Sequence, residues 1–165
     1  MSSQGETTKL PGEENEGFDP PITGGVVVGH DGSTRSSVAL AWAADEARLR
    51  GLPLHVVRAW KLSTAIPETN VPFGTVPSWD ECANAIKAAI DRALENVDTA
   101  GLTVHRHALH GSPSTLLVEA SQHADMVVVG ERGQGGFAGL VIGSVAEQVV
   151  RHGKSTVVVV REDAA

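Results

Sequence analysis

The fold is decided by one stretch near the carboxyl end, Met126-Val127-Val128-Val129-Gly130-Glu131-Arg132-Gly133, followed nine residues later by Gly143-Ser144. The apolar run predicts a buried strand, and the glycines after it predict a loop. The next residues, 145–150, predict the start of a helix, and the four valines at 157–160 predict a last strand. A loop that feeds a helix N-terminus favours anion binding, because free backbone N–H groups and the helix dipole both point into it.

The length and charge of the chain limit its class. The 165 residues suffice for one domain with a buried core. Acidic side chains exceed basic ones by seven, and residues 1–21 contribute four of these net negative charges. This segment is polar, acidic and rich in Gly and Pro, so we predict a disordered tail over 1–21 and a folded domain over 22–162. The mildly acidic remainder argues against nucleic acid as a partner.

Compartment and membrane signals are few. The single Cys82 excludes an internal disulfide, and its place on an apolar helix stripe predicts a packing role. No apolar run is long enough to span a bilayer, and the first residues lack the basic start and apolar stretch of a signal peptide. We therefore expect a cytoplasmic protein with no membrane partner.

The rest of the chain alternates between strand and helix patterns. Further strands are expected over 24–29, 52–60 and 103–109, the last at a sheet edge. Further helices are expected over 33–50, from Ser78 to near Gly101, and from Pro113 to about His123. Residues 61–77 predict a long loop, with three prolines and little periodicity. This alternation predicts an α/β fold with a parallel sheet.

Two groups of residues in this frame leave alternatives open. Asp31 follows the first strand, at the sheet edge where α/β proteins bind ligands, but with Ser33 it also fits a simple turn and helix cap. Trp60 and Phe73 are candidates for covering a planar ligand, or for packing under the long loop.

Three further patterns are interpreted as unrelated to function. His105, His107 and His110 suggest a metal site, but no Cys, Asp or Glu lies nearby in sequence to complete it, so no metal is expected. Gly153-Lys154-Ser155 lacks the earlier glycine and the following helix of a P-loop. The run 133–138 resembles a dinucleotide turn, but it lies in the last strand–helix unit and lacks the acidic ribose-binding residue.

The spaced glycine pattern has a known counterpart. Gly-x-x-Gly, nine residues and Gly-Ser, together with the run Val28-Gly29-His30-Asp31-Gly32-Ser33 and the terminal valine strand, resembles the universal stress protein family, and its nucleotide-binding branch in particular. The resemblance covers roughly Gly24 to Arg161. It implies a single-domain, Rossmann-like fold of the adenine nucleotide α-hydrolase type: an open parallel five-stranded sheet, helices on both faces, and strand order 3-2-1-4-5.

The resemblance also implies an adenine-nucleotide site. The implied cofactor-binding residues are Asp31, Gly32, Ser33, Val56, Val129, Gly130, Arg132, Gly133, Gly143, Ser144 and Val145. Asp31 would lie by the adenine and ribose, Val56 would contact the adenine, and residues 129–130 would lie under the ribose. Gly133 would let the loop approach the phosphates, to which residues 143–145 would donate backbone N–H groups. Side chains at the glycines would block this approach or forbid positive φ, and Ser144 would both cap the helix and donate.

Glu131 departs from the family pattern, which commonly has a small hydroxylated or amide residue there. A carboxylate beside a polyphosphate is repulsive unless it points away or meets a cation, and Arg132 is the neighbouring cation.

The functional expectation is an ATP-binding stress-response sensor or regulator, with Mg²⁺ as a possible companion of the nucleotide. The sequence has no catalytic constellation, so no enzyme activity beyond slow ATP hydrolysis is expected. An apolar edge strand at Val157–Val160 predicts a homodimer, as in the family. Two alternatives are a cyclic-AMP-binding protein using the same pocket and a dimeric interaction protein that binds no nucleotide.

Overall fold

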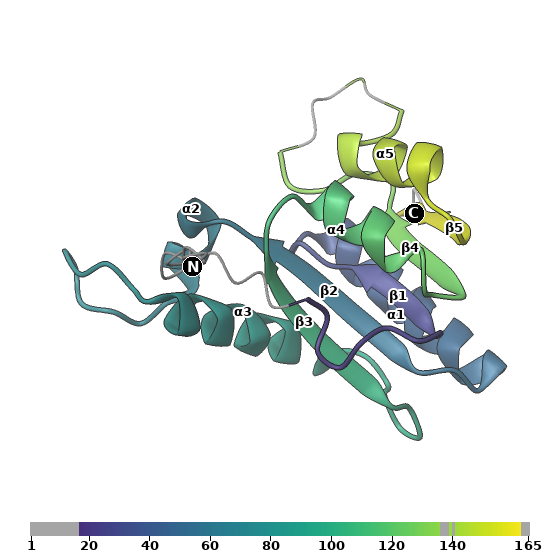
Figure 1. Ribbon diagram of the computed structural model, residues 1–165, viewed down its shortest axis with the longest axis horizontal. Coiled ribbons are helices and arrows are strands. Elements are labelled where there is room, and N and C mark those ends of the chain that lie inside the picture. The colour runs from purple at the N-terminus through teal and green to yellow at the C-terminus, as the bar shows by residue number, and fades with distance from the viewer. Residues whose placement is uncertain (1–16, 136–138, 140, 163–165) are drawn as a thin grey trace, which may run out of the picture.

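The computed structural model describes residues 17–135, 139 and 141–162. Most of the predicted tail (1–16) and part of the dinucleotide-like run (136–138) lie outside these residues. Within them, five parallel strands form one sheet in the order β3-β2-β1-β4-β5, which confirms the predicted fold class (Figure 1). No helix in the described ranges is long and apolar enough to cross a membrane.

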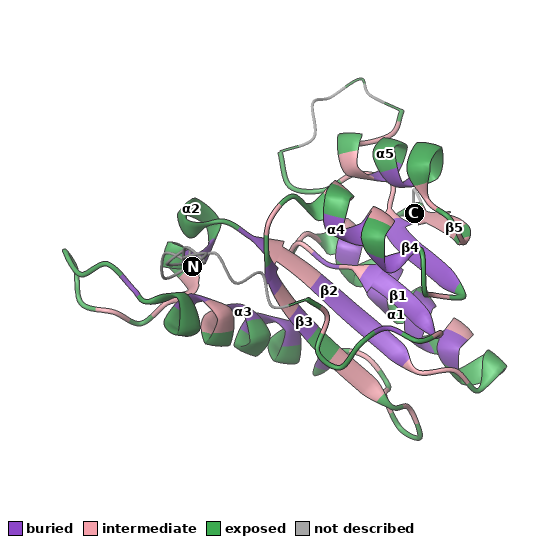
Figure 2. Cartoon of the chain, in the orientation of Figure 1, coloured by how far each residue is buried: buried purple, intermediate pink, exposed green. Residues whose placement is uncertain are grey.

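The central strands are the apolar runs of the sequence. The strands are β1 Val26–Gly29, β2 Leu54–Trp60, β3 Val104–His110, β4 Met126–Gly130 and β5 Thr156–Val160. β1 pairs with β2 and β4 on its two sides, so Val26 to Val28 have no exposed surface. A strand buried on both faces needs apolar side chains at every position, which is why the runs do not alternate (Figure 2).

Two helical layers cover the sheet (Figure 1). The longer helices are α1 Thr34–Arg50, α3 Trp79–Leu94, α4 Pro113–Ala120 and α5 Ser144–His152. Val26 and Val28 pack with α1 and α3, whereas Val27 packs with α4 and α5. Successive strand side chains point to opposite faces, so one valine run contributes to both halves of the core.

Helix ends follow the expected capping chemistry, with one exception. Ser33 caps α1 by accepting from the Ser36 N–H, and Gly51 ends that helix with φ +64°. Ser78 and Glu81 form the predicted capping box of α3. However, α3 ends at Leu94 rather than near Gly101, because the chain turns where Asp98 Oδ1 accepts from the Ala100 N–H.

The predicted long loop contains helical structure that the sequence pattern did not indicate. A short helix, α2 Leu62–Ala65, is followed by a 3₁₀ turn, η1 Ile66–Glu68. Thr64 Oγ1 accepts a hydrogen bond from the Lys61 N–H at 2.9 Å, and this contact stabilises the start of the short helix. Elements of three or four residues are too short to show a helical period.

Candidate functional site

A cavity of about 900 Å³ lies at the carboxyl ends of β1, β2 and β4. This volume is within the roughly 300–1,000 Å³ range of small-molecule sites. The structure brings eight of the predicted residues to its wall: Asp31, Val129, Gly130, Arg132, Gly133, Gly143, Ser144 and Val145. They come from three segments of the chain: the β1–α1 turn, the end of β4 with the glycine loop that follows it, and the start of α5.

Asp31 joins the β1–α1 turn to the glycine loop. Its Oδ1 accepts from the Ser33 N–H at 2.9 Å, and its Oδ2 accepts from the Gln134 N–H at 2.8 Å. Burial acts to raise the pKa of Asp31, but hydrogen bonds from Ser33, Gln134 and Ser36 outweigh it and hold the pKa below its ordinary value. Asp31 therefore makes the turn that the simpler interpretation expected and also lines the cavity.

The glycines permit close approach of main chain rather than unusual backbone angles. A Cβ on Gly133 would lie 2.4 Å from Asp31 Oδ2, and a Cβ on Gly143 would lie 3.1 Å from the Arg132 Cα. Gly130 is equally confined, 3.1 Å from the Arg35 carbonyl oxygen. None of the three glycines has positive φ, so that part of the sequence argument is wrong. Their small size alone brings the loop against the turn.

The start of α5 also differs in detail from the prediction. Gly143 is the N-cap, with φ −76° and ψ 160°, and Ser144 is the first helical residue. Ser144 therefore lies at the helix N-terminus without capping it. The Gly143 N–H donates to the Glu131 carbonyl oxygen at 2.6 Å, which closes the glycine loop at its base. The first-turn N–H groups after this cap remain the donors that an anion would meet.

Glu131 does not line the cavity. Its carboxylate is 3.8 Å from Arg35 Nε on one oxygen and 3.9 Å from Arg161 Nε on the other. Arg132 Nη2 is also 4.0 Å away. The side chain of Glu131 is only 14% exposed, so cations surround it away from the cavity wall. The repulsion that this residue would otherwise exert on a phosphate is thereby relieved.

Three predicted residues are absent from the cavity wall. Val56 is fully buried in the core beneath α1, because strand side chains alternate and this position points away from the α4 face. The β2 residues that line the cavity come later, from Val57 to Trp60, and Lys61 follows them. Gly32 and Ser33 follow Asp31 in the β1–α1 turn, where Ser33 caps α1 and Gly32 takes φ +88°.

Sequence reasoning missed several polar residues of the wall, among them His30 and Arg58. His30 follows β1, with its Nε2 3.4 Å from Ser37 Oγ. Burial is the main cause that lowers the pKa of His30, and Arg58 lowers it further. Arg58, near the end of β2, also lines the cavity. The available signal for Arg58 was a charged side chain near the carboxyl end of a mostly apolar strand.

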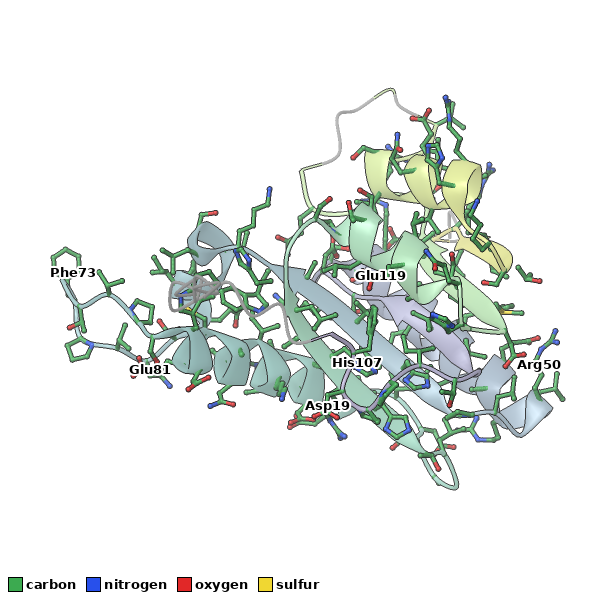
Figure 3. The ribbon with its side chains drawn as sticks, viewed as in Figure 1. Asp19, Arg50, Phe73, Glu81, His107 and Glu119 are labelled. Carbon is green, nitrogen blue, oxygen red and sulfur yellow. The ribbon has the colours of Figure 1, made fainter. Side chains whose placement is uncertain are left out.

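The two aromatic candidates, Trp60 and Phe73, lie in different surroundings. Trp60 is buried and lines the cavity, with its ring centroid 5.2 Å from that of Trp79 and 5.0 Å from that of His110. Phe73 is fully exposed at the tip of its loop and points away from the sheet, so it neither covers the cavity nor packs under the loop (Figure 3).

A family model for universal stress proteins matches residues 24–161, across the sheet, the glycine loop and α5. The chain belongs to the universal stress protein family. This confirms the family that the glycine spacing indicated.

Curated relatives carry the same family name. A universal stress protein of Mycolicibacterium smegmatis is 32% identical over 161 residues, which cover 96% of this chain and 52% of that protein. One of Mycobacterium tuberculosis is 33% identical over 151 residues, which cover 91% of this chain and 49% of that protein. This chain therefore spans about half the length of the curated relatives it matches.

Solved structures of the family share the fold. A universal stress protein in complex with cAMP is 27% identical, with a TM-score of 0.58 over 86% of this chain and 98% of that one. One from Archaeoglobus fulgidus in complex with dAMP is 24% identical, with a TM-score of 0.56 over 84% and 98% of the two chains.

This universal stress protein also holds a histidine cluster outside the cavity. His105 and His107 share one face of β3, as predicted, and His55 on β2 joins them. His55 Nδ1 lies 3.0 Å from His107 Nε2, and Phe18 covers His107 edge-on (Figure 3). Burial is the main cause that lowers the pKa of both hydrogen-bonded histidines to about 4. Among the described residues, no group of three or more His, Cys, Asp or Glu is arranged to hold a metal ion.

Proposed function

We propose that this universal stress protein binds ATP in the cavity at the carboxyl ends of β1, β2 and β4, as a cytoplasmic stress-response sensor or regulator. The observation that carries the proposal is the main-chain wall made by Gly133 and Gly143. Added Cβ atoms there would meet Asp31 and the Arg132 backbone, so only glycine keeps the loop and the α5 N-terminus together. That arrangement suits a phosphate group.

The side chains at the cavity support an anionic ligand. Arg132 places a cation at the wall, and its Nε is buried without a hydrogen-bond partner among the described residues. Asp31, whose pKa is held below its ordinary value by hydrogen bonds, lines the same cavity, where the family resemblance implies the adenosine. The position of Glu131 beside Arg35 and Arg161 removes the main objection to nucleotide binding.

Cyclic AMP is the second candidate ligand. The solved relative in complex with cAMP is 27% identical and aligns over most of both chains. The two ligands differ in charge and in phosphate number, and the α5 N-terminus provides donors for either. A triphosphate would use more of the glycine loop than a cyclic monophosphate.

Binding rather than catalysis is the proposed activity, with hydrolysis no faster than a slow side reaction. Both carboxylate oxygens of Asp31 already accept hydrogen bonds from backbone N–H groups. The described residues offer no cluster of metal ligands, so Mg²⁺ would arrive on the nucleotide phosphates and not in a protein-built site. A lone carboxylate of this kind is a poor base for activating water.

The assembly proposed is a homodimer through β5, and the acidic residues before Phe18 are proposed to aid solubility, since Phe18 itself packs against His107. β5 pairs only with β4, and Val157 to Val160 are all partly exposed along that edge. An apolar strand edge of this kind is suited to pairing with a second copy. Sedimentation velocity of the wild-type chain and of a Val158→Lys variant tests this, with the variant expected as a monomer.

Nucleotide binding is tested by native mass spectrometry for co-purified nucleotide and by titration calorimetry with ATP and with cyclic AMP. Gly143→Val should abolish binding, because its side chain would displace the Arg132 backbone. Gly17→Val is the matched control, since nothing lies within 4 Å of that position. A wild-type chain that purifies empty and gives no heat with either nucleotide would refute the proposal.

A further inference from the structure

Arg58 places a cation at the cavity wall, near the glycine loop. Its side chain is only 12% exposed. Its Nη2 lies 3.2 Å from the point that a Cβ on Gly32 would occupy, and Gln134 Nε2 lies 3.3 Å from the same point. Two donors therefore converge over Gly32, where the β1–α1 turn meets the glycine loop. A guanidinium and a side-chain amide thus lie close together at the wall of the cavity.

Glu68 forms an ion pair with Arg58 in this structure. Its Oε1 lies 3.4 Å from Arg58 Nη2, and its Oε2 accepts from Arg92 Nη2 at 2.8 Å. The contact to Arg58 is thus the longer of the two. Glu68 ends η1, so this carboxylate ties the short helical segment at the rim to a residue of the wall.

The charge balance of the wall favours an anion at Arg58. Among the described residues, the fully charged side chains that line the cavity are Arg58, Lys61, Arg132, Asp31 and Glu68. Asp31 is already satisfied by backbone N–H groups, and Glu68 keeps its shorter contact with Arg92. A guanidinium binds a phosphate through two parallel N–H donors, which a single contact of 3.4 Å does not match.

We propose that Arg58 is a phosphate-recognition residue of the cavity and that Glu68 is its internal competitor, so that a bound nucleotide takes Arg58 from Glu68. This inference rests on the proposed nucleotide binding at the same cavity. In this proposal β2, through Arg58, takes part in phosphate recognition together with the glycine loop. It also makes the rim segment 62–68 dependent on what the cavity holds.

The first test compares ATP with adenosine by titration calorimetry. Arg58→Gln should weaken ATP binding about tenfold or more, as expected for losing a charge-assisted hydrogen bond, and leave adenosine binding unchanged. Arg58→Lys should restore part of the affinity for ATP, because it keeps the charge and loses the paired donors. Equal weakening of ATP and adenosine by Arg58→Gln would mean that Arg58 only supports the wall, and would overturn the assignment.

The second test addresses the competitor. Glu68→Gln should strengthen ATP binding by roughly threefold, and this gain should vanish in the Arg58→Gln background, as a double-mutant cycle measures. Glu46→Gln is the matched control, because it removes a carboxylate paired to an arginine on α1, away from the cavity. A Glu68→Gln variant with unchanged affinity, or a gain that persists without Arg58, would overturn the competition.

These outcomes separate the two proposals. A wild-type chain that binds neither ATP nor adenosine refutes nucleotide binding itself. A wild-type chain that binds ATP while Arg58→Gln binds it equally well refutes only the role of Arg58. Circular dichroism of each variant establishes that a lost affinity is not a lost fold.

Discussion

The histidine pair on β2 and β3 and the aspartate that follows β1 are polar groups in opposite electrostatic settings. His55 and His107 are buried, and burial lowers the pKa of each to about 4, so both are neutral at pH 7. Asp31, past the carboxyl end of β1, keeps its charge, because N–H donors from Ser33 and Gln134 outweigh the effect of burial. Burial alone therefore does not decide the charge of a group in this protein; the donors around the group decide it.

The largest expected effect is the pH dependence of stability that the buried histidines His55 and His107 produce. The unfolded pKa of a histidine is about 6.5, so between pH 6.5 and 4 the unfolded chain binds more protons than the folded one, and stability falls as the pH falls. One histidine shifted this far contributes up to about 3 kcal/mol, lost across that window. Urea unfolding at pH 7, 5.5 and 4.5 measures the loss.

His107→Leu provides the control for this effect. It removes one titrating ring, so the decline of stability between pH 6.5 and 4 should become shallower. If stability falls with pH as steeply in the variant as in wild type, the acid sensitivity lies elsewhere in the chain and the histidine half of the comparison is wrong.

The next effect concerns Asp31 at the cavity. Asp31→Asn replaces an acceptor of two N–H groups with an amide that presents one acceptor and one donor, so one N–H loses its partner. The expected cost is about 1–3 kcal/mol in unfolding free energy, with roughly tenfold weaker ATP binding. Thermal unfolding and calorimetry measure the two effects.

Asp45→Asn, which removes an exposed carboxylate on α1, is the control for Asp31→Asn. Since the folded pKa of Asp31 is depressed, its contribution is present above the unfolded pKa and lost only as the pH falls through the folded value. The Asp31→Asn variant should therefore stay less stable than wild type from pH 7 down to pH 5. Equal stability over that range would contradict the donor argument.

The smallest effect concerns the cover of the histidine cluster. Phe18→Ala removes the ring that packs edge-on against His107, at a centroid distance of 5.4 Å. The loss should cost about 1 kcal/mol in stability and admit water to His107, which raises its pKa toward the ordinary value. NMR titration of the histidine ring protons measures that pKa; a value that stays near 4 would show that the sheet alone keeps the ring dry.

The fold could be predicted largely from the sequence, because the residue patterns that indicate strands and helix starts are local. The valine runs at β1 and β4 and the capping residues Ser33 and Ser78 each act within a few residues, so the sequence pattern sufficed for the strands and most helix starts, whereas the strand order came from the family resemblance. The glycine spacing likewise indicated the family, because a close approach of main chain tolerates no side chain.

The sequence by itself determined the parallel sheet, its helical layers and the main-chain wall of the cavity, because periodicity, caps and glycines express local backbone chemistry. Only the tertiary structure decided which side chains face the cavity. It turned Val56 into the core, brought Arg58 to the wall, and set Glu131 among arginines from α1 and the chain end. It also paired His55 with His107, which are 52 residues apart. The direction and charge environment of a side chain depend on neighbours distant in sequence, and those neighbours exist only after the strands have paired.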